Sequence, residues 1–110
     1  MFIGQLSIVS AQSYEAGKAS YYADKFQGRK TASGEMYHKD SMTCAHRTYS
    51  FGTTLKVISL KNDKSVIVRV NDRGPFVAGR NVDLSRKAME NLGGLEKGII
   101  EVKIEILKPD

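Results

Sequence analysis

Two β-rich runs that lie only four residues apart constrain the fold of this chain more than any other feature. Residues 54–60 (TLKVISL) and 65–70 (SVIVRV) are rich in β-branched side chains, and residues 61–64 (KNDK) connect them. Asn62 and Asp63 tolerate the left-handed backbone conformation that a tight turn requires. The pattern therefore predicts a β-hairpin.

Two further segments have the pattern of strands. In residues 98–107, apolar side chains at 100, 102, 104 and 106 alternate with charged ones, which predicts a strand buried on one face. Residues 17–22 (GKASYY) predict a shorter strand. Short strands with Gly-rich turns favour a small closed barrel over an open sheet.

One short helix is predicted near the C-terminal end. Ser85 can accept a backbone N–H as its N-cap, apolar residues follow at 88, 89 and 92, and glycines at 93 and 94 end it. Asp83 precedes this helix, and we expect it to cap the helix as well.

The length of 110 residues fits one domain and excludes multi-domain enzymes. No apolar run approaches the roughly 20 residues of a transmembrane helix. Seventeen Lys and Arg against twelve Asp and Glu give a net charge of +5, which favours polyanions as partners. Nucleic acid is not expected among them, because the charges are scattered and no aromatic binding signature is present.

Residues 1–14 are interpreted as a truncated signal peptide or a flexible arm. Residues 9–11 (VSA) resemble a signal-peptidase site, but no Lys or Arg precedes them. Cys44 and His46 could pair as a nucleophilic dyad, yet a free cysteine is more typically a small buried hydrophobe. The paired ligands of a zinc site are missing, so no metal and no cofactor are expected.

Three polar residues, Glu35, His46 and Asp72, are candidates for a catalytic site. Asp72 directly follows a buried strand, where partial desolvation favours the protonated carboxyl that a general acid needs. His46 could orient it, and Glu35 could position water or a sugar hydroxyl. As alternatives, Asp72 could bind the amides of its own turn, Glu35 could be a solvated loop tip, and His46 could be a core histidine.

Three arginines, Arg69, Arg73 and Arg80, surround the same region of the sequence. They could hold an anionic ligand through bidentate hydrogen bonds, or form a solvated basic rim.

Six segments in order resemble the rare lipoprotein A family of bacterial cell-wall proteins, over about residues 17–107. They are 17–22 (GKASYY), 31–35 (TASGE), 45–48 (AHRT), 51–53 (FGT), 68–76 (VRVNDRGPF) and 79–85 (GRNVDLS). The resemblance implies a mainly β fold, a six-stranded double-psi β-barrel with one or two short helices, over residues 15–110. A groove is expected across the barrel.

The resemblance also implies a lytic transglycosylase of peptidoglycan, in the periplasm, cell envelope or extracellular space. Such an enzyme cuts the β-1,4 bond from N-acetylmuramic acid to N-acetylglucosamine, preferably in peptide-poor strands, and leaves 1,6-anhydro ends. The acidic-site positions of the family fall on Glu35, His46 and Asp72. No cysteine near the N-terminus and no C-terminal glycan-targeting module are seen, so lipid anchoring and septal targeting are not expected from this chain.

The alternative hypothesis is a non-catalytic, expansin-like barrel that binds polysaccharide without cutting it. Tyrosine rings at 21, 22, 37 and 49 could stack on sugar faces. Tyr22 is assigned to substrate binding, together with Arg69, Arg73 and Arg80, which would hold the lactyl carboxylates of muramic acid. The protein is expected to be a monomer whose partner is the glycan strand.

Overall fold

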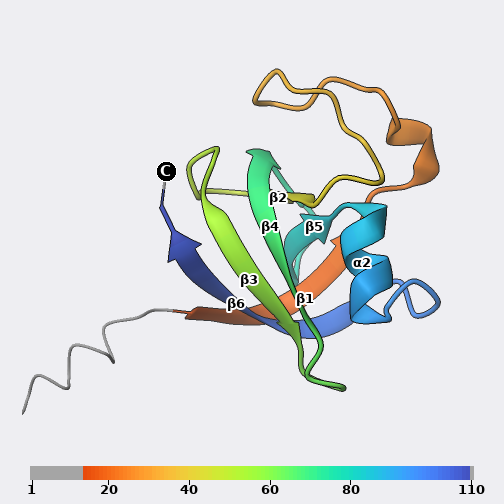
Figure 1. Cartoon of the computed structure of the whole chain (residues 1–110), viewed down its shortest axis with the longest axis vertical. Helices are drawn as coiled ribbons and strands as arrows, with labels where there is room; N and C mark the ends of the chain where they lie inside the picture. The colour runs from red at the N-terminus through yellow and green to blue at the C-terminus, as the bar shows by residue number, and fades with distance from the viewer. Residues whose placement is uncertain (1–13, 110) are drawn as a thin grey trace, which may run out of the picture.

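Six β-strands close into a barrel in the order β1-β5-β2-β4-β3-β6, as Figure 1 shows. The structure, a computed structural model, describes residues 14–109. The strands are β1 Tyr14–Tyr21, β2 Thr43–His46, β3 Thr54–Ser59, β4 Ser65–Asp72, β5 Arg80–Leu84 and β6 Ile100–Lys108. This confirms the expected mainly β, six-stranded barrel.

The predicted hairpin is present as β3 and β4, which pair in antiparallel fashion. Asp63 in its turn has a positive φ of 62°, the conformation for which the turn residues were expected. The alternating C-terminal run is β6, which pairs with β1 and with β3 and so closes the barrel. The shorter predicted strand is β1, which begins at Tyr14 rather than at residue 17.

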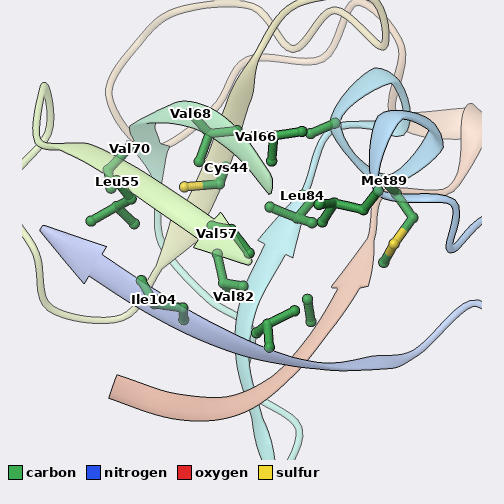
Figure 2. Close-up of a cluster of buried hydrophobic side chains, with 14 residues drawn as sticks. Cys44, Leu55, Val57, Val66, Val68, Val70, Val82, Leu84, Met89 and Ile104 are labelled. Atoms are coloured by element: carbon green, nitrogen blue, oxygen red, sulfur yellow. The ribbon is translucent and has the colours of Figure 1, made fainter. Parts of the chain in front are cut away.

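The interior of the barrel is filled by aliphatic side chains that alternate along the strands (Figure 2). Val66, Val68 and Val70 of β4 point inward, and the side chains between them point outward. Cys44 lies among them with no exposed surface. Burial raises the pKa of its thiol, so Cys44 is a core residue, and the nucleophilic dyad with His46 is excluded.

Among residues 14–109, two short helices accompany the barrel. The helix α2, Arg86–Leu92, begins at Ser85, whose hydroxyl accepts the Ala88 N–H at 3.2 Å, and ends at Gly93 in the left-handed conformation. Both ends are as predicted. The expectation that Asp83 caps this helix is wrong, because Asp83 lies within β5 and its side chain bonds Ser20 instead. The second helix is a single 3-10 turn, η1, Asp24–Phe26.

Residues 22–42, which connect β1 to β2 and include η1, form a long segment that we call the 22–42 connection. It folds back on itself through the bonds Gly28 N–H to Tyr37 O (2.9 Å) and Thr31 N–H to Glu35 O (2.7 Å). In Figure 1 it lies on the side of the molecule where β4 ends, opposite the β3–β4 turn. Its Ala32 N–H donates to Asp72 at 2.8 Å, so the connection lies beside the end of β4.

Two sequence predictions concern the chain ends and the membrane. The interpretation of residues 1–14 as a signal or arm falls outside the described residues, except for Tyr14, which belongs to β1. Within residues 14–109, no helix is long and apolar enough to cross a membrane.

Candidate active site

A β-bulge turns Asp72 out of the barrel. Cys44 of β2 pairs with Val70 of β4, but the next residue, Ala45, pairs with Asp72, so Asn71 is an extra residue in β4. Without this insertion, strict alternation after Val70 would point the Asp72 side chain into the apolar core. Bulges often re-aim side chains beside active sites, and this one places a carboxylate on the outer face.

Three hydrogen-bond donors hold the Asp72 carboxylate. The backbone N–H groups of Ala32 and Arg73 donate to Oδ1 at 2.8 and 2.9 Å, and the Tyr22 hydroxyl donates to Oδ2 at 2.5 Å. Each carboxylate oxygen has two acceptor sites. Both sites of Oδ1 are therefore used, whereas Oδ2 keeps one site for a mobile proton. Of the amides in its own turn, Asp72 thus accepts that of Arg73, whereas the Ala32 amide comes from the 22–42 connection.

Glu35 lies beside the same strand end. Arg69 forms a two-pronged pair with it, Nη1 to Oε2 and Nη2 to Oε1, each at 3.0 Å, and the Asn71 amide donates to Oε1 at 3.1 Å. The hydrogen bond from Arg69, and then that from Asn71, lowers the pKa of Glu35 below its ordinary value. Glu35 is therefore an anchored anion rather than a free loop tip.

Next to Glu35 lies an open pocket of about 400 Å³ between the 22–42 connection and the outer face of β2 and β4. Its lining comprises Glu35, Met36, His38, Ser41, Thr43, Arg69 and Asn71. Of the candidate catalytic residues, Glu35 lines this pocket, and Asn71, which also lines it, is the chain neighbour of Asp72. A larger hollow lies elsewhere, around Lys18 and Ile100, and contains none of them.

His46 contacts Glu15 and not Asp72. Its Nδ1 accepts the N–H groups of Thr48 (3.1 Å) and Tyr49 (3.2 Å), so Nε2 carries the hydrogen and donates to Glu15 Oε1 at 3.0 Å. The ring also stacks on Tyr49, with centroids 3.7 Å apart. The expectation that His46 bonds and orients Asp72 directly is therefore wrong, because both ring nitrogens have other partners.

Glu15 was not recognised from the sequence. Besides His46, it accepts the Asn81 amide at 2.6 Å and the Tyr49 hydroxyl at 2.9 Å. Burial acts to raise the pKa of Glu15, but the bonds from Asn81, His46 and Tyr49 outweigh it and hold that pKa below its ordinary value. In the sequence Glu15 lies just before the predicted strand of residues 17–22, with nothing to mark it as a site residue. Only the closed fold brings it beside His46, which is 31 positions away.

Arg73 joins the two clusters. Its Nη1 donates to the backbone carbonyls of His46 (3.2 Å) and Tyr49 (2.8 Å), and its guanidinium lies 4.0 Å from the centre of the Phe51 ring. The backbone N–H of Arg73 also bonds Asp72. Arg73 therefore fixes the Asp72 carboxylate relative to the segment that contains His46. Its guanidinium is thus used within the protein.

Of the three arginines assigned to substrate, Arg80 is the one whose guanidinium has no hydrogen bond or ion pair to residues 14–109. Its hydrogen bonds involve the backbone alone: the N–H donates to the Val77 carbonyl at 3.2 Å, and the carbonyl accepts Arg47 Nη1 at 2.6 Å. Arg69 and Arg73 both have protein partners. Arg80 is therefore the arginine with most capacity left for a substrate carboxylate.

Tyr22 is buried, with 8% of its surface exposed. Its ring stacks on Tyr37, with centroids 4.3 Å apart, and meets the Phe26 ring edge-on. Burial, followed by the bond to Asp72, raises the pKa of Tyr22, so its hydroxyl remains a proton donor to that carboxylate. The geometry assigns the Tyr22 hydroxyl to Asp72 and leaves little ring surface for a sugar.

Asp83 is a second carboxylate of the same face. Ala45 pairs with Asp72 on one side and with Asp83 on the other, and Asp83 pairs with Ser20, whose hydroxyl donates to it at 2.9 Å. Burial raises the pKa of Asp83, and the charge of Asp72 adds to this, against the lowering by Ser20 and Arg80. In the sequence Asp83 lies between two apolar residues, Val82 and Leu84, and this alternation is the signal that could have placed it in a strand.

Replacing Asp83 with Asn is expected to stabilise the protein at mildly alkaline pH. Because the folded state raises the pKa of this group, its ionisation opposes folding above the unfolded value of about 3.9, and no penalty exists well below it. The melting temperature of Asp83→Asn should exceed that of wild type at high pH and equal it in acid. Asp63→Asn, at an exposed turn residue, is the control that should show no such dependence.

The barrel closure and the carboxylates on its outer face define the class of protein, a double-psi β-barrel with an acidic site at the end of β4. A family model described as "Lytic transglycolase" matches residues 14–104. The chain belongs to this family, in agreement with the resemblance seen in its sequence motifs. Within the described residues, no group of three or more His, Cys, Asp or Glu could hold a metal ion.

Several curated relatives carry the name endolytic peptidoglycan transglycosylase RlpA. The chain is 47% identical over 94 residues to the protein of Pasteurella multocida, a match that covers 86% of this chain and 32% of the relative. The protein of Neisseria meningitidis serogroup A is 46% identical over 99 residues, with 90% and 41% covered. The chain thus spans about a third of the length of the first of these relatives and two-fifths of the second.

Solved structures show the same fold. The apo expansin of Clavibacter michiganensis superposes with a TM-score of 0.68 at 27% identity, covering 87% of this chain and 51% of that one. The Streptomyces papain inhibitor superposes with a TM-score of 0.71 at 22% identity, covering 87% and 96%. The second likeness concerns the fold alone.

Proposed function

We propose that this barrel is a lytic transglycosylase domain that cuts the β-1,4 bond between N-acetylmuramic acid and N-acetylglucosamine in peptidoglycan. The observation that carries the proposal is Asp72, a partly exposed carboxylate held by three donors beside an open pocket. The names of the relatives support the substrate class. The domain would work as a monomer in the cell envelope, and no nucleic acid is expected to bind.

The reaction needs one group that acts first as an acid and then as a base. Protonated Asp72 donates the proton on Oδ2 to the glycosidic oxygen, and the bond from that oxygen to muramoyl C1 breaks. The carboxylate then removes the proton of the C6 hydroxyl, and O6 bonds to C1 as the 1,6-anhydro ring closes. The proton is returned to Asp72 and no water is consumed.

The surrounding residues position this carboxylate. The two backbone donors hold Oδ1, so that Oδ2 points its remaining acceptor site in one direction. Glu35, paired with Arg69, forms one wall of the neighbouring pocket. Arg80 is proposed to bind the lactyl carboxylate of a peptide-free muramic acid, because its guanidinium has no partner among the described residues.

The test is product analysis with the full chain. Intact sacculi and glycan strands freed of peptides by an amidase are digested in heavy-oxygen water, and the soluble products are read by mass spectrometry. We expect 1,6-anhydro ends without heavy oxygen, and more of them from the peptide-free strands. Heavy oxygen in the new ends would indicate hydrolysis instead and contradict the proposal.

A non-catalytic binding function is favoured by one observation, the side chain of Phe76. It lies four residues after Asp72 and is 80% exposed, so it offers an aromatic face to a sugar. Expansin, in which this fold also occurs, is a relative in structure. Wild-type protein that binds the same glycans in a pull-down but releases no products would support this alternative.

Replacing Tyr22 with Phe is expected to lower kcat about tenfold to a hundredfold, since a hydrogen bond to a charged group contributes about 1.5–3 kcal/mol. KM should stay unchanged, because the buried ring is not expected to contact the glycan. Tyr21→Phe is the matched control, as the Tyr21 hydroxyl bonds the distant Leu95 carbonyl. A rise in KM with kcat unchanged would restore the sugar-binding role first assigned to Tyr22.

A further inference from the structure

The pocket beside Glu35 carries no unpaired charge. Both terminal nitrogens of Arg69 face Glu35, and the Asn71 amide donates to Oε1 of that carboxylate as well. A ligand carboxylate placed here would compete with Glu35 for Arg69 and would be repelled by it. An uncharged polar group suits the pocket better.

One residue of this pocket carries a buried polar atom without a partner. Thr43 is 6% exposed, and within residues 14–109 its Oγ1 is the buried side-chain nitrogen or oxygen that lacks a hydrogen bond. Thr43 also lines the pocket. A buried hydroxyl without a partner costs folding stability, so a ligand group that bonds it recovers free energy on binding.

Strand geometry places Thr43 close to the reacting carboxylate. Cys44 points into the core, so Thr43 and Ala45 both point outward, toward the 22–42 connection. Two residues along a strand are about 7 Å apart, and Ala45 is the cross-strand neighbour of Asp72. The pocket therefore lies roughly one sugar unit from Asp72.

We propose that this pocket binds the acetamido group of the sugar next to the cleaved bond. The Thr43 hydroxyl, after rotation about Cα–Cβ, donates to the acetamido carbonyl, and the acetamido methyl packs on Met36, which is 53% exposed at the rim. Ser41 supplies a second hydroxyl for the acetamido N–H. The inference rests on the proposed function, for which this group is part of every sugar of the substrate.

The test compares two soluble oligomers that differ only at this group. N,N′,N″,N‴-tetraacetylchitotetraose and cellotetraose share the β-1,4 backbone, but the second has a hydroxyl in place of the acetamido group. Each is titrated into the full chain labelled with carbon-13 at its methionine methyls. The chitin oligomer should bind more tightly and shift the Met36 signal, whereas Met89, with no exposed surface in the core, is the internal control.

Two variants isolate the hydroxyl. Thr43→Val removes it at constant shape and should weaken chitotetraose binding about threefold to tenfold, the worth of one neutral hydrogen bond, without changing cellotetraose binding. Thr43→Ser should restore the preference. Equal affinity of wild type for both oligomers, no binding of chitotetraose, or an unchanged preference in Thr43→Val would each overturn the inference.

Failure of this site and failure of the proposed reaction give different results. Binding that depends on Thr43, together with no 1,6-anhydro products from peptidoglycan, would leave the acetamido site standing and remove the reaction. If 1,6-anhydro products form but the two oligomers bind equally well, the reaction would stand and the acetamido site would be removed. Thermal melting of both variants verifies that they are folded.

Discussion

Replacing Asp72 with Asn should abolish the release of 1,6-anhydro products while leaving the barrel folded. A positioned acid–base group contributes about 10² to 10⁴ in rate, and here one group performs both steps, so the loss should reach at least that range. Asn keeps an acceptor oxygen for the N–H groups of Ala32 and Arg73, and its amide can donate to the Tyr22 hydroxyl. Product formation is measured by mass spectrometry and folding by thermal melting.

The matched control for Asp72→Asn is Asp63→Asn. Asp63 lies in the β3–β4 turn at the opposite end of β4, and Asn also tolerates its positive φ. This control should retain wild-type activity and stability. If Asp72→Asn formed products at the wild-type rate, Asp72 would not be the acid–base group and the mechanism would have to be abandoned.

Replacing His46 with Ala is expected to reduce the free energy of unfolding by about 2–4 kcal/mol, and activity with it. The change leaves the N–H groups of Thr48 and Tyr49 without their acceptor and creates a void under the Tyr49 ring. It also releases the segment to which Arg73 is bonded, and Arg73 holds Asp72. Chemical denaturation and product yield are to be measured together.

His38→Ala is the control for this loss. His38 is exposed and only its Nδ1 is engaged, 3.0 Å from Gln27 Nε2, so stability should change little. A His46→Ala protein with undiminished stability but no activity would instead indicate that His46 acts on the substrate itself.

The variant Glu15→Gln tests the same hydrogen-bond network around His46 through the pH dependence of its stability. Its bonds lower the pKa of Glu15, so its carboxylate stabilises the folded state above the ordinary value of about 4.3, and this contribution disappears as the pH falls through the folded value. The stability gap between wild type and Glu15→Gln should therefore be widest near neutral pH and close in acid. A gap that is constant with pH would show that the Glu15 charge has no part in it.

Local features of the chain could be predicted because neighbouring residues decide them. The β3–β4 turn depends on Asn62 and Asp63, the start of α2 on the Ser85 hydroxyl, and the face of β6 on strict alternation of side chains. The motifs also predicted Glu35 and Asp72 as site residues, because each lies in a short segment whose residue types match the family. For the turn and the start of the helix, the contacts that matter span only a few positions.

The assignment of partners to the site residues could not be predicted. Alternation alone would place Asp72 inside the barrel, and only the bulge at Asn71, set by pairing with β2, turns it outward. His46 meets Glu15 across 31 positions, and Tyr22 meets Asp72 across 50. Such long-range contacts depend on barrel closure rather than on local preference.

By itself, the sequence predicted the strands β1, β3, β4 and β6, the hairpin and the ends of α2, since periodicity and turn chemistry act over short distances, whereas the short strands β2 and β5 were taken for loops. The positions of the acidic site were predicted from the resemblance to the family. The tertiary structure decided which side chains form hydrogen bonds with one another. It paired His46 with Glu15, Tyr22 with Asp72 and Arg69 with Glu35. The reason is that a hydrogen bond requires atoms within about 3 Å, and only the closed barrel brings segments distant in sequence to that separation.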